Sequence, residues 1–321
     1  MKKIIFKCIT FLLILLVILI ILSKIFVPKN NTKEAGLENK YILASGIYLE
    51  PENTIDVLVV GDSESYTSYI PLEMWNQYGF TSYVCGTAAQ PLPLTFKYIY
   101  DTLKKQNPKM IIIEANAVYR RKGLDIPIAT LGNQLFPIVQ YHDRWKDLAL
   151  ADFTSGVNYT NRQPNKGYYY SKKTSVVKEY VEYMKRRPNK SKTVPILNKI
   201  YMEFIKKYCD AKGIELMLYS SPAPANWTEN KHNGVQKLAD HLGIDYIDFN
   251  TMHDKLNLNF KTDYREDNGD HPNHLGALKV TKLLGEYLHN NKTLPDHRTD
   301  EKYSFWNEDY EHYKQSLTNK K

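Results

Sequence analysis

Two polar clusters far apart in the sequence carry residue types that together could catalyse acyl chemistry. The first is Ser63, which directly follows an apolar run in "IDVLVVGDSESY". A serine hydroxyl is a weak nucleophile until a base takes its proton and a third group orients that base. The second cluster, "REDNGDHPNHLG", offers Asp267, Asp270 and His271. If folding brings the clusters together, the chain has the groups of a serine–histidine–acid site.

Acyl chemistry also needs hydrogen-bond donors where the negative charge of the transition state develops. Gly86 ends a second apolar segment, "TSYVCG", and could offer its backbone N–H. Asn116 ends a third, "KMIIIEAN", and could offer its side-chain amide. Each residue has an ordinary alternative role, in a turn for Gly86 and Asn116 and as a helix N-cap for Ser63. Their placement at successive segment ends makes the combination more informative than any one of them.

The second cluster also has the composition of a metal site, because Asp267, Asp270, His271 and His274 lie within eight positions. Pro272 separates the two histidines, however, so they do not share a helical face as the metal-binding histidines of H-E-x-x-H do. We therefore expect no metal and no other cofactor.

The elements that must position these side chains alternate along the chain. Apolar, strand-like runs occupy five segments: 54–60, 81–86, 109–116, 214–222 and 244–250. Segments with helical periodicity lie between and after them: 71–79, 94–105, 197–213, 233–243 and 276–288. This alternation predicts an α/β fold with a five-stranded parallel sheet and helices on both faces. In such sheets, sites form at the carboxyl ends of the strands, which is where Ser63 is expected.

The N-terminus has the pattern of a membrane anchor. Lysines at positions 2, 3 and 7 precede an apolar stretch of about 20 residues, enough for one transmembrane helix. No small-residue cleavage site follows it. We expect an uncleaved signal anchor at 1–27, a stalk at 28–50 and a domain at 51–321 held by a single-pass anchor on the extracytoplasmic side of the cell membrane.

The charge of the chain narrows the choice of partners. A net charge of +8 and a pI near 9.0 suit proximity to anionic lipid headgroups or cell-wall polymers, although a merely basic surface has the same composition. The lysines are scattered, so we expect no nucleic acid partner. The three cysteines, Cys8, Cys85 and Cys209, form no disulfide framework and are interpreted as thiols.

Residues 120–195 interrupt the alternation and follow the strand that carries Asn116. An insertion of this length is typical of a lid or binding loop. We therefore predict substrate contacts from Arg144 and Tyr168 in the insertion, and from Trp227 and His232 after the fourth strand. Packing of the domain is the open alternative for these side chains. The aromatic stripe near the C-terminus predicts a helix at about 300–318.

The motifs in their order resemble the SGNH/GDSL hydrolase superfamily. The Gly-Asp-Ser strand end places Ser63 where that family has its nucleophile, and Gly86 and Asn116 match its oxyanion-hole positions. His271, in "HPN", matches the catalytic base. The family motif that contains this asparagine is Gly-x-Asn-Asp. Here "EAN" replaces Gly-x-Asn, and Ala117 replaces the aspartate. The resemblance covers most of 54–290 and implies a three-layer, flavodoxin-like fold and a serine hydrolase acting on esters.

The acid of the catalytic triad is the point at which the resemblance weakens. The family has an aspartate three residues before the histidine, where this chain has Asn268. Asp267 lies one residue further back, as if this loop carried an insertion, and Asp270 is adjacent to His271. We favour Asp267, with Asp270 as the alternative.

More narrowly, "YIPLEMWNQYG", "SSPAPANW" and "GDHPNHLGALKVT" resemble membrane-anchored members in Gram-positive bacteria, among them the D-alanyl transfer proteins of teichoic-acid modification. The resemblance implies an esterase or O-acyltransferase acting on acyl esters of a cell-surface glycopolymer. A membrane-bound O-acyltransferase would be the partner. The alternative from another class is a non-catalytic accessory protein that binds polymer or scaffolds such an acyltransferase.

Overall fold

The computed structural model describes residues 1–120, 123–177, 182–186 and 191–318. The chain forms two compact units, which we treat separately. The first comprises residues 1–42 and 123–161, and the second comprises 43–122 and 162–321. The second unit holds the sheet and all the residues predicted to be catalytic.

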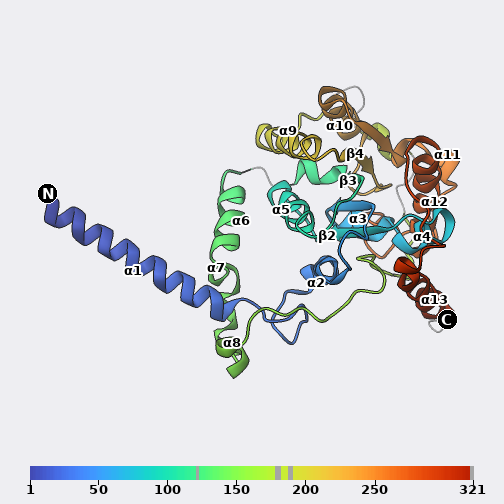
Figure 1. The fold of residues 1–321 in the computed structure, drawn as a ribbon. Helices are drawn as coiled ribbons and strands as arrows, with labels where there is room; N and C mark the ends of the chain where they lie inside the picture. Colours follow the sequence, from blue (N-terminus) through green and yellow to red (C-terminus); the bar gives the residue numbers. More distant parts are fainter. Residues whose placement is uncertain (121–122, 178–181, 187–190, 319–321) are drawn as a thin grey trace. The chain divides into compact units, whose positions relative to one another are not determined.

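A five-stranded parallel sheet forms the centre of the second unit (Figure 1). Its strands are β1 (Val57–Gly61), β2 (Ser82–Gly86), β3 (Met110–Glu114), β4 (Glu215–Ser220) and β5 (Asp245–Asp248). They lie in the order β2-β1-β3-β4-β5, and every neighbouring pair is parallel. This is the flavodoxin-like order 2-1-3-4-5. The α/β fold with a parallel sheet predicted from the sequence is confirmed.

Helices cover both faces of the sheet because its strands are apolar on both sides. Leu58 and Val60 of β1 pack in one core cluster with side chains from α5 (Leu92–Thr102), α9 (Ile196–Asp210) and α10 (Glu229–Leu242). Val57 and Val59 point the other way. They join a second cluster with side chains from α4 (Pro71–Tyr78) and α12 (His274–Asn291). The sheet is therefore the middle layer of three.

The ends of these helices follow from local sequence. Pro71 begins α4, and Gly79 ends it with a left-handed backbone (φ 77°) that glycine adopts at little cost. At the start of α12, the side chain of Asn273 accepts hydrogen bonds from the N–H groups of Leu275 and Gly276. This cap fixes the helix directly after His271.

The remaining helices of the second unit are short, apart from the C-terminal one. They are η1 (Gly46–Leu49), α3 (Ser63–Ser68), η2 (Ala115–Tyr119), η4 (Tyr183–Arg186), η5 (Phe249–Thr251), α11 (His253–Leu256), η6 (Glu301–Tyr303) and α13 (Ser304–Thr318). Helix α13 packs Trp306 against Trp75, with 5.6 Å between ring centroids. The buried ammonium of Lys166 pairs with Glu50 at 2.8 Å and with Asp309 of α13 at 2.7 Å.

The first unit contains α1 (Lys2–Phe26), α6 (Asp125–Leu135), α7 (Ile138–Tyr141), η3 (His142–Lys146) and α8 (Leu150–Thr154). Helix α2 (Asn39–Ser45) lies where the sequence passes from the first unit to the second. By length and composition, α1 could cross a membrane. Parts of the predicted insertion, 121–122, 178–181 and 187–190, lie outside the described residues.

Candidate active site

Ser63 lies at the carboxyl edge of the sheet, where β1 ends and α3 begins. The turn between them is tight. Gly61 has a φ of 151°, and a Cβ on it would lie 2.7 Å from Cβ of Glu114. At the end of β2, a Cβ on Gly86 would meet the Ser65 hydroxyl and lie 3.2 Å from the Asp62 carbonyl oxygen. Both strands therefore end in glycine so that the backbone around the serine can come close to its neighbours.

His271 is held by Asp267. Nδ1 of the imidazole lies 2.9 Å from Oδ2 of Asp267, and the backbone N–H of His271 donates to Oδ1 of the same carboxylate at 3.1 Å. Asp270 Oδ2 is 3.7 Å from Nδ1, beyond hydrogen-bond distance. The geometry thus favours Asp267 over Asp270 as the residue that orients the imidazole.

The loop between Asp267 and His271 explains how an acid four residues before the histidine can reach it. Asn268 and Gly269 have φ values of 58° and 85°. Asparagine and glycine are the residues that adopt this left-handed conformation most readily. Two such residues in a row turn the chain back, so that the extra position is absorbed and the Asp267 carboxylate faces the imidazole.

Glu64 lies between the serine and the histidine. The Ser63 hydroxyl donates to Oε2 of Glu64 at 3.1 Å, and Nε2 of His271 is 4.0 Å from the same oxygen. Within the described residues, this Nε2 has no hydrogen-bond partner. The two groups therefore meet at the same edge of the sheet, but the direct Ser63–His271 hydrogen bond expected of an active triad is replaced. A carboxylate is a strong acceptor, which accounts for the preference of the hydroxyl.

The side-chain amide of Asn116 is directed at Glu64 too. Its Nδ2 donates to Oε1 of Glu64 at 2.6 Å and to Oδ2 of Asp62 at 3.3 Å. Lys231 Nζ donates to the amide oxygen of Asn116 at 2.9 Å, which fixes the orientation of the amide. Asn116, the predicted oxyanion-hole donor, and Ser63 thus both bind the carboxylate of Glu64.

Two further donors hold the Glu64 carboxylate. Asn226 Nδ2 donates to Oε1 of Glu64 at 2.9 Å, and it also contacts Asp270. The Arg120 guanidinium donates to Oε1 at 3.3 Å and forms an ion pair with Asp62. With its side chain about 1% exposed, Glu64 is a buried carboxylate whose hydrogen bonds come from several loops at the edge of the sheet.

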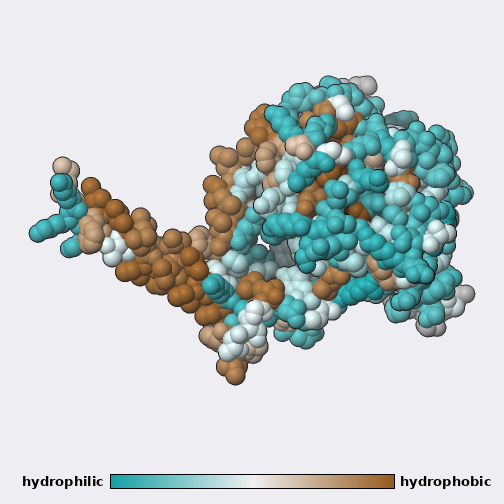
Figure 2. Space-filling view, in the orientation of Figure 1, coloured by the Kyte–Doolittle hydropathy of each residue, from teal (hydrophilic) through white to brown (hydrophobic). Residues whose placement is uncertain are grey.

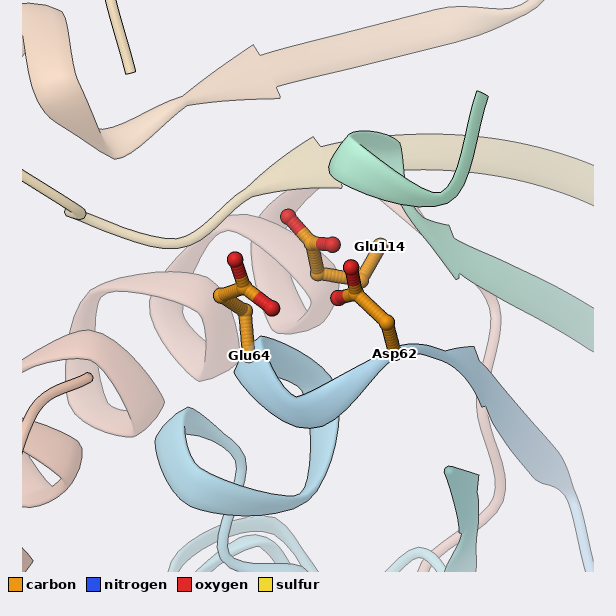
Figure 3. Close-up of side chains that lie close together, drawn as sticks. All are labelled: Asp62, Glu64 and Glu114. Carbon is orange, nitrogen blue, oxygen red and sulfur yellow. The ribbon is translucent and has the colours of Figure 1, made fainter. Parts of the chain in front are cut away.

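Three carboxylates gather at this point, those of Asp62, Glu64 and Glu114 (Figure 3). Their ligand-type oxygens lie within 4.8 Å of one another. Burial and the charge of Glu64 raise the pKa of Glu114 to about 8, and burial with the charges of Glu64 and Glu114 raises the pKa of Asp62. The Arg120 guanidinium pairs with Asp62 and with Glu64, so a neighbouring cation balances part of the negative charge of the cluster.

The charges of the site favour an ion pair between Glu64 and His271. Burial opposes ionisation of Glu64, but its hydrogen bonds with Asp62 and Asn226 and the charges of His271 and Arg120 lower its pKa to about 2. Burial likewise opposes a charge on His271, but the hydrogen bond with Asp267 and the charges of Glu64 and Asp270 raise its pKa. Each charge thus favours the charged form of the other group.

The side chains predicted to bind substrate lie in different surroundings. Trp227 is buried and donates to Asp248 at 2.9 Å, and Tyr168 is buried with its hydroxyl 3.1 Å from Nδ1 of His274. His232 contacts Asp248 at 2.9 Å and lines a cavity of about 700 Å³. Arg144 belongs to the first unit. Trp227 and Tyr168 thus pack inside the second unit, and substrate contact by any of the four stays a prediction.

His274 does not take part in the site. Burial lowers its pKa to about 4, and its ring lies against Tyr170 and Tyr313. It is a neutral packing residue at the start of α12, so the four-residue cluster considered above as a metal site is divided between two environments.

Sequence reasoning missed four members of the site: Glu64, Arg120, Asn226 and Lys231. Two of them could have been suspected from their positions. Glu64 directly follows Ser63, and Arg120 follows Asn116 by four residues. Asn226 lies in "SSPAPANW", which entered the sequence analysis only as part of the resemblance, and Lys231 follows that segment. Neither residue was given a role. Their role became visible only from the contacts described above.

Comparison with known proteins gives remote similarities. No protein-family model and no curated protein matches the chain. Among solved structures, a protein provisionally described as a platelet activating factor from Streptococcus pneumoniae aligns with a TM-score of 0.41 and 14% identity, over 77% of this chain and 89% of that chain. A GDSL-like lipase from Bacteroides thetaiotaomicron aligns with a TM-score of 0.37 and 13% identity, over 78% of this chain and 98% of that chain. A lipase/acylhydrolase from Enterococcus faecalis aligns with a TM-score of 0.38 and 10% identity, over 75% of this chain and 99% of that chain.

Similarities of this size carry no conclusion about what this chain does. The side chains of this chain are more informative. Ser63, His271 with Asp267, and the Asn116 amide converge at the carboxyl edge of the parallel sheet, around the carboxylate of Glu64.

Proposed function

We propose that the protein is a serine esterase or O-acyltransferase of the SGNH type. The observation that carries the proposal is the meeting of Ser63 and the Asp267–His271 pair at a single point, beside the amide of Asn116. Nucleophile, base, orienting acid and oxyanion donor are the four parts that acyl transfer needs. The serine, the Asn116 amide and the Asp267–His271 pair come from three different segments of the chain at one edge of the sheet.

In the proposed reaction, Oγ of Ser63 attacks the carbonyl carbon of an ester while Nε2 of His271 takes the hydroxyl proton. Asp267 keeps the imidazole oriented and stabilises its positive charge. The amide of Asn116 and the N–H groups of Gly86 and Ser63 would bind the oxyanion. The protonated His271 then gives its proton to the departing alcohol, which leaves an acyl group on Ser63. Water or a second hydroxyl removes that group in the reverse sequence.

Glu64 must leave its position before this reaction can begin. Its Oε2 holds the serine hydroxyl and its Oε1 holds the Asn116 amide, so the carboxylate occupies the place of the substrate carbonyl and its oxygen. Displacement of the side chain by an incoming ester would free both groups and let the Ser63 hydroxyl turn to His271.

The substrate that we propose is an acyl ester of a cell-surface glycopolymer, with a polymer hydroxyl as an alternative acceptor to water. The support comes from the sequence: an N-terminal helix with the length and composition of a membrane span, preceded by lysines, and a net charge of +8 on the chain. A single-pass anchor with the second unit outside the cytoplasm would place a basic protein beside anionic polymers. A membrane-bound O-acyltransferase would be a suitable source of acyl groups.

The test uses the full chain in detergent micelles and a fluorophosphonate probe, which labels activated serines. We expect labelling of the wild type, loss of labelling in Ser63→Ala, and the same loss for hydrolysis of p-nitrophenyl acetate. Ser65→Ala is the matched control, since its hydroxyl is two positions away and donates to the Asp62 carbonyl oxygen. A folded wild type that is neither labelled nor hydrolytic would overturn the proposal.

The position of Glu64 also favours a second candidate, a non-catalytic accessory protein. A site that is permanently filled by its own carboxylate would bind or scaffold without turnover. Complementation of a deletion strain decides between the two: Ser63→Ala restores function fully if the protein is an accessory, and fails if the serine reacts.

A further inference from the structure

The first unit carries an apolar stripe along α6 and α7 that no described side chain of the same unit covers. Leu124, Ile128, Leu131, Leu135 and Val139 recur at steps of three or four residues, and each is more than half exposed. Neither α6 nor α7 has any buried residue. A face of this spacing on a helix is normally the one that packs against the rest of a protein. Here it is open.

The stripe continues into the segment that follows. Leu150, Phe153 and Val157, in and after α8, are also more than half exposed. Between the two apolar groups stands Trp145 of η3, which is 63% exposed, with the Lys146 ammonium 5.5 Å from its ring centroid. Exposed apolar patches of such extent mark interaction sites.

The same segment is attached to the end of α1. The N–H of Ile138 donates to the Ser23 hydroxyl at 3.4 Å, and the Arg144 guanidinium donates to the Phe26 carbonyl oxygen at 2.5 Å. Arg144 is buried and pairs with Asp152 of α8 at 2.8 Å. It thereby satisfies a carbonyl that the last turn of α1 leaves without a helical partner. These contacts fix α7, η3 and α8 at the C-terminal end of α1.

Helix α1 indicates what covers the stripe. It has 25 residues and would span about 37 Å, more than the hydrocarbon core of a bilayer. Nearly all its side chains are exposed, and Figure 2 shows apolar surface along α1 and over the α6 segment. Where α1 leaves the hydrocarbon core, the segment attached to it meets the interfacial layer. An exposed tryptophan beside a lysine is typical of that layer, and so is an amphipathic helix.

We propose that α6, α7, η3 and α8 lie in the membrane interface at the C-terminal end of α1, with their apolar stripe in the lipid. The protein then has a two-part anchor, one helix across the bilayer and one helical segment along its surface. Helix α6 has a single charged residue, Asp125, so apolar burial rather than charge holds it there. This inference rests on the membrane anchoring proposed above and is independent of the esterase chemistry.

Trp145 makes the proposal measurable in the unaltered protein. The chain has four tryptophans, and the other three, Trp75, Trp227 and Trp306, are at most 1% exposed. The full chain is reconstituted into phosphatidylcholine and phosphatidylglycerol vesicles whose acyl chains are brominated near the headgroup end. We expect bromine to quench part of the wild-type emission and to quench Trp145→Phe much less.

Two controls distinguish a failure of the membrane anchoring from a failure of the proposed interfacial segment. Flotation with the vesicles tests α1: a protein that does not float refutes the membrane anchoring itself. A protein that floats but shows equal quenching of wild type and Trp145→Phe refutes the interfacial segment, and the stripe then belongs to a protein partner.

A second variant tests the stripe without touching the tryptophan. Ile128 is 70% exposed, so Ile128→Glu should leave thermal unfolding of the detergent-solubilised protein unchanged. It should reduce the bromine quenching of Trp145, because a charge is costly within the lipid layer. Unchanged quenching, or loss of the fold, would show that this face does not lie in lipid.

Discussion

The histidine side of the site, with His271 and Asp267, differs from the serine side, with Ser63 and Asn116, in whether its groups are free to react. On the histidine side, Asp267 already holds Nδ1 of His271 at 2.9 Å and accepts a hydrogen bond from its backbone N–H, so the imidazole is oriented as the proposed acyl transfer requires. On the serine side, the hydroxyl of Ser63 and the amide of Asn116 are both bound to Glu64. Orientation of the proposed base is therefore built into the structure, whereas access to the proposed nucleophile is not.

Removing the orientation of the base should have the largest effect. In Asp267→Asn the carboxylate that fixes and stabilises His271 becomes a neutral amide, and we expect the rate of fluorophosphonate labelling to fall by roughly 10²–10⁴-fold. Asp270→Asn is the matched control, because that carboxylate is 3.7 Å from Nδ1 and makes no hydrogen bond with it. A larger loss in Asp270→Asn than in Asp267→Asn would reverse the assignment of the acid.

Freeing the serine side should have a smaller effect of opposite sign. Glu64→Gln keeps the shape of the side chain but removes the charge that attracts the hydroxyl and the Asn116 amide. A hydrogen bond to a charged group contributes about 1.5 kcal/mol or more, so we expect labelling to accelerate by roughly tenfold.

The control for Glu64→Gln is Glu215→Gln, which removes a charge at the start of β4, the opposite end of that strand from the site. Thermal unfolding of both variants shows whether the fold is kept. Slower labelling in folded Glu64→Gln would mean that Glu64 takes part in the proton transfer instead of blocking it.

The same two halves show what the sequence could and could not predict. The carboxyl ends of parallel strands share one edge, so apolar, strand-like runs ending at Ser63, Gly86 and Asn116 were enough to predict that these residues gather. Asp267 was favoured over Asp270 on the interpretation that the loop before His271 carries one extra residue, although the resemblance weakens there. These predictions depend on the backbone, which apolar periodicity largely determines.

The contacts of Glu64 depend instead on side chains from four loops. Asn226 and Arg120 reach it from positions 162 and 56 residues away in the sequence. No periodicity or motif relates such positions, and a buried carboxylate beside a nucleophile is not part of any short pattern. The open stripe of the first unit was missed for a similar reason. Its spacing is that of a packed helix, and only the structure shows that no described side chain of its own unit lies against it.

The smallest expected effect is a shift in pH dependence, and it links the two halves. His271 must be neutral to accept the serine proton, and its pKa is raised above the usual 6.5 because its partners Asp267, Glu64 and Asp270 outweigh burial. Labelling should therefore increase as the pH rises through a midpoint above 6.5. In Glu64→Gln one of the negative charges is gone, so the imidazole loses its proton more easily and the midpoint moves to lower pH. Rates measured across neutral pH for both proteins test this. An unmoved midpoint would mean that Glu64 and His271 are not electrostatically coupled, and the serine side would then be blocked without any influence on the base.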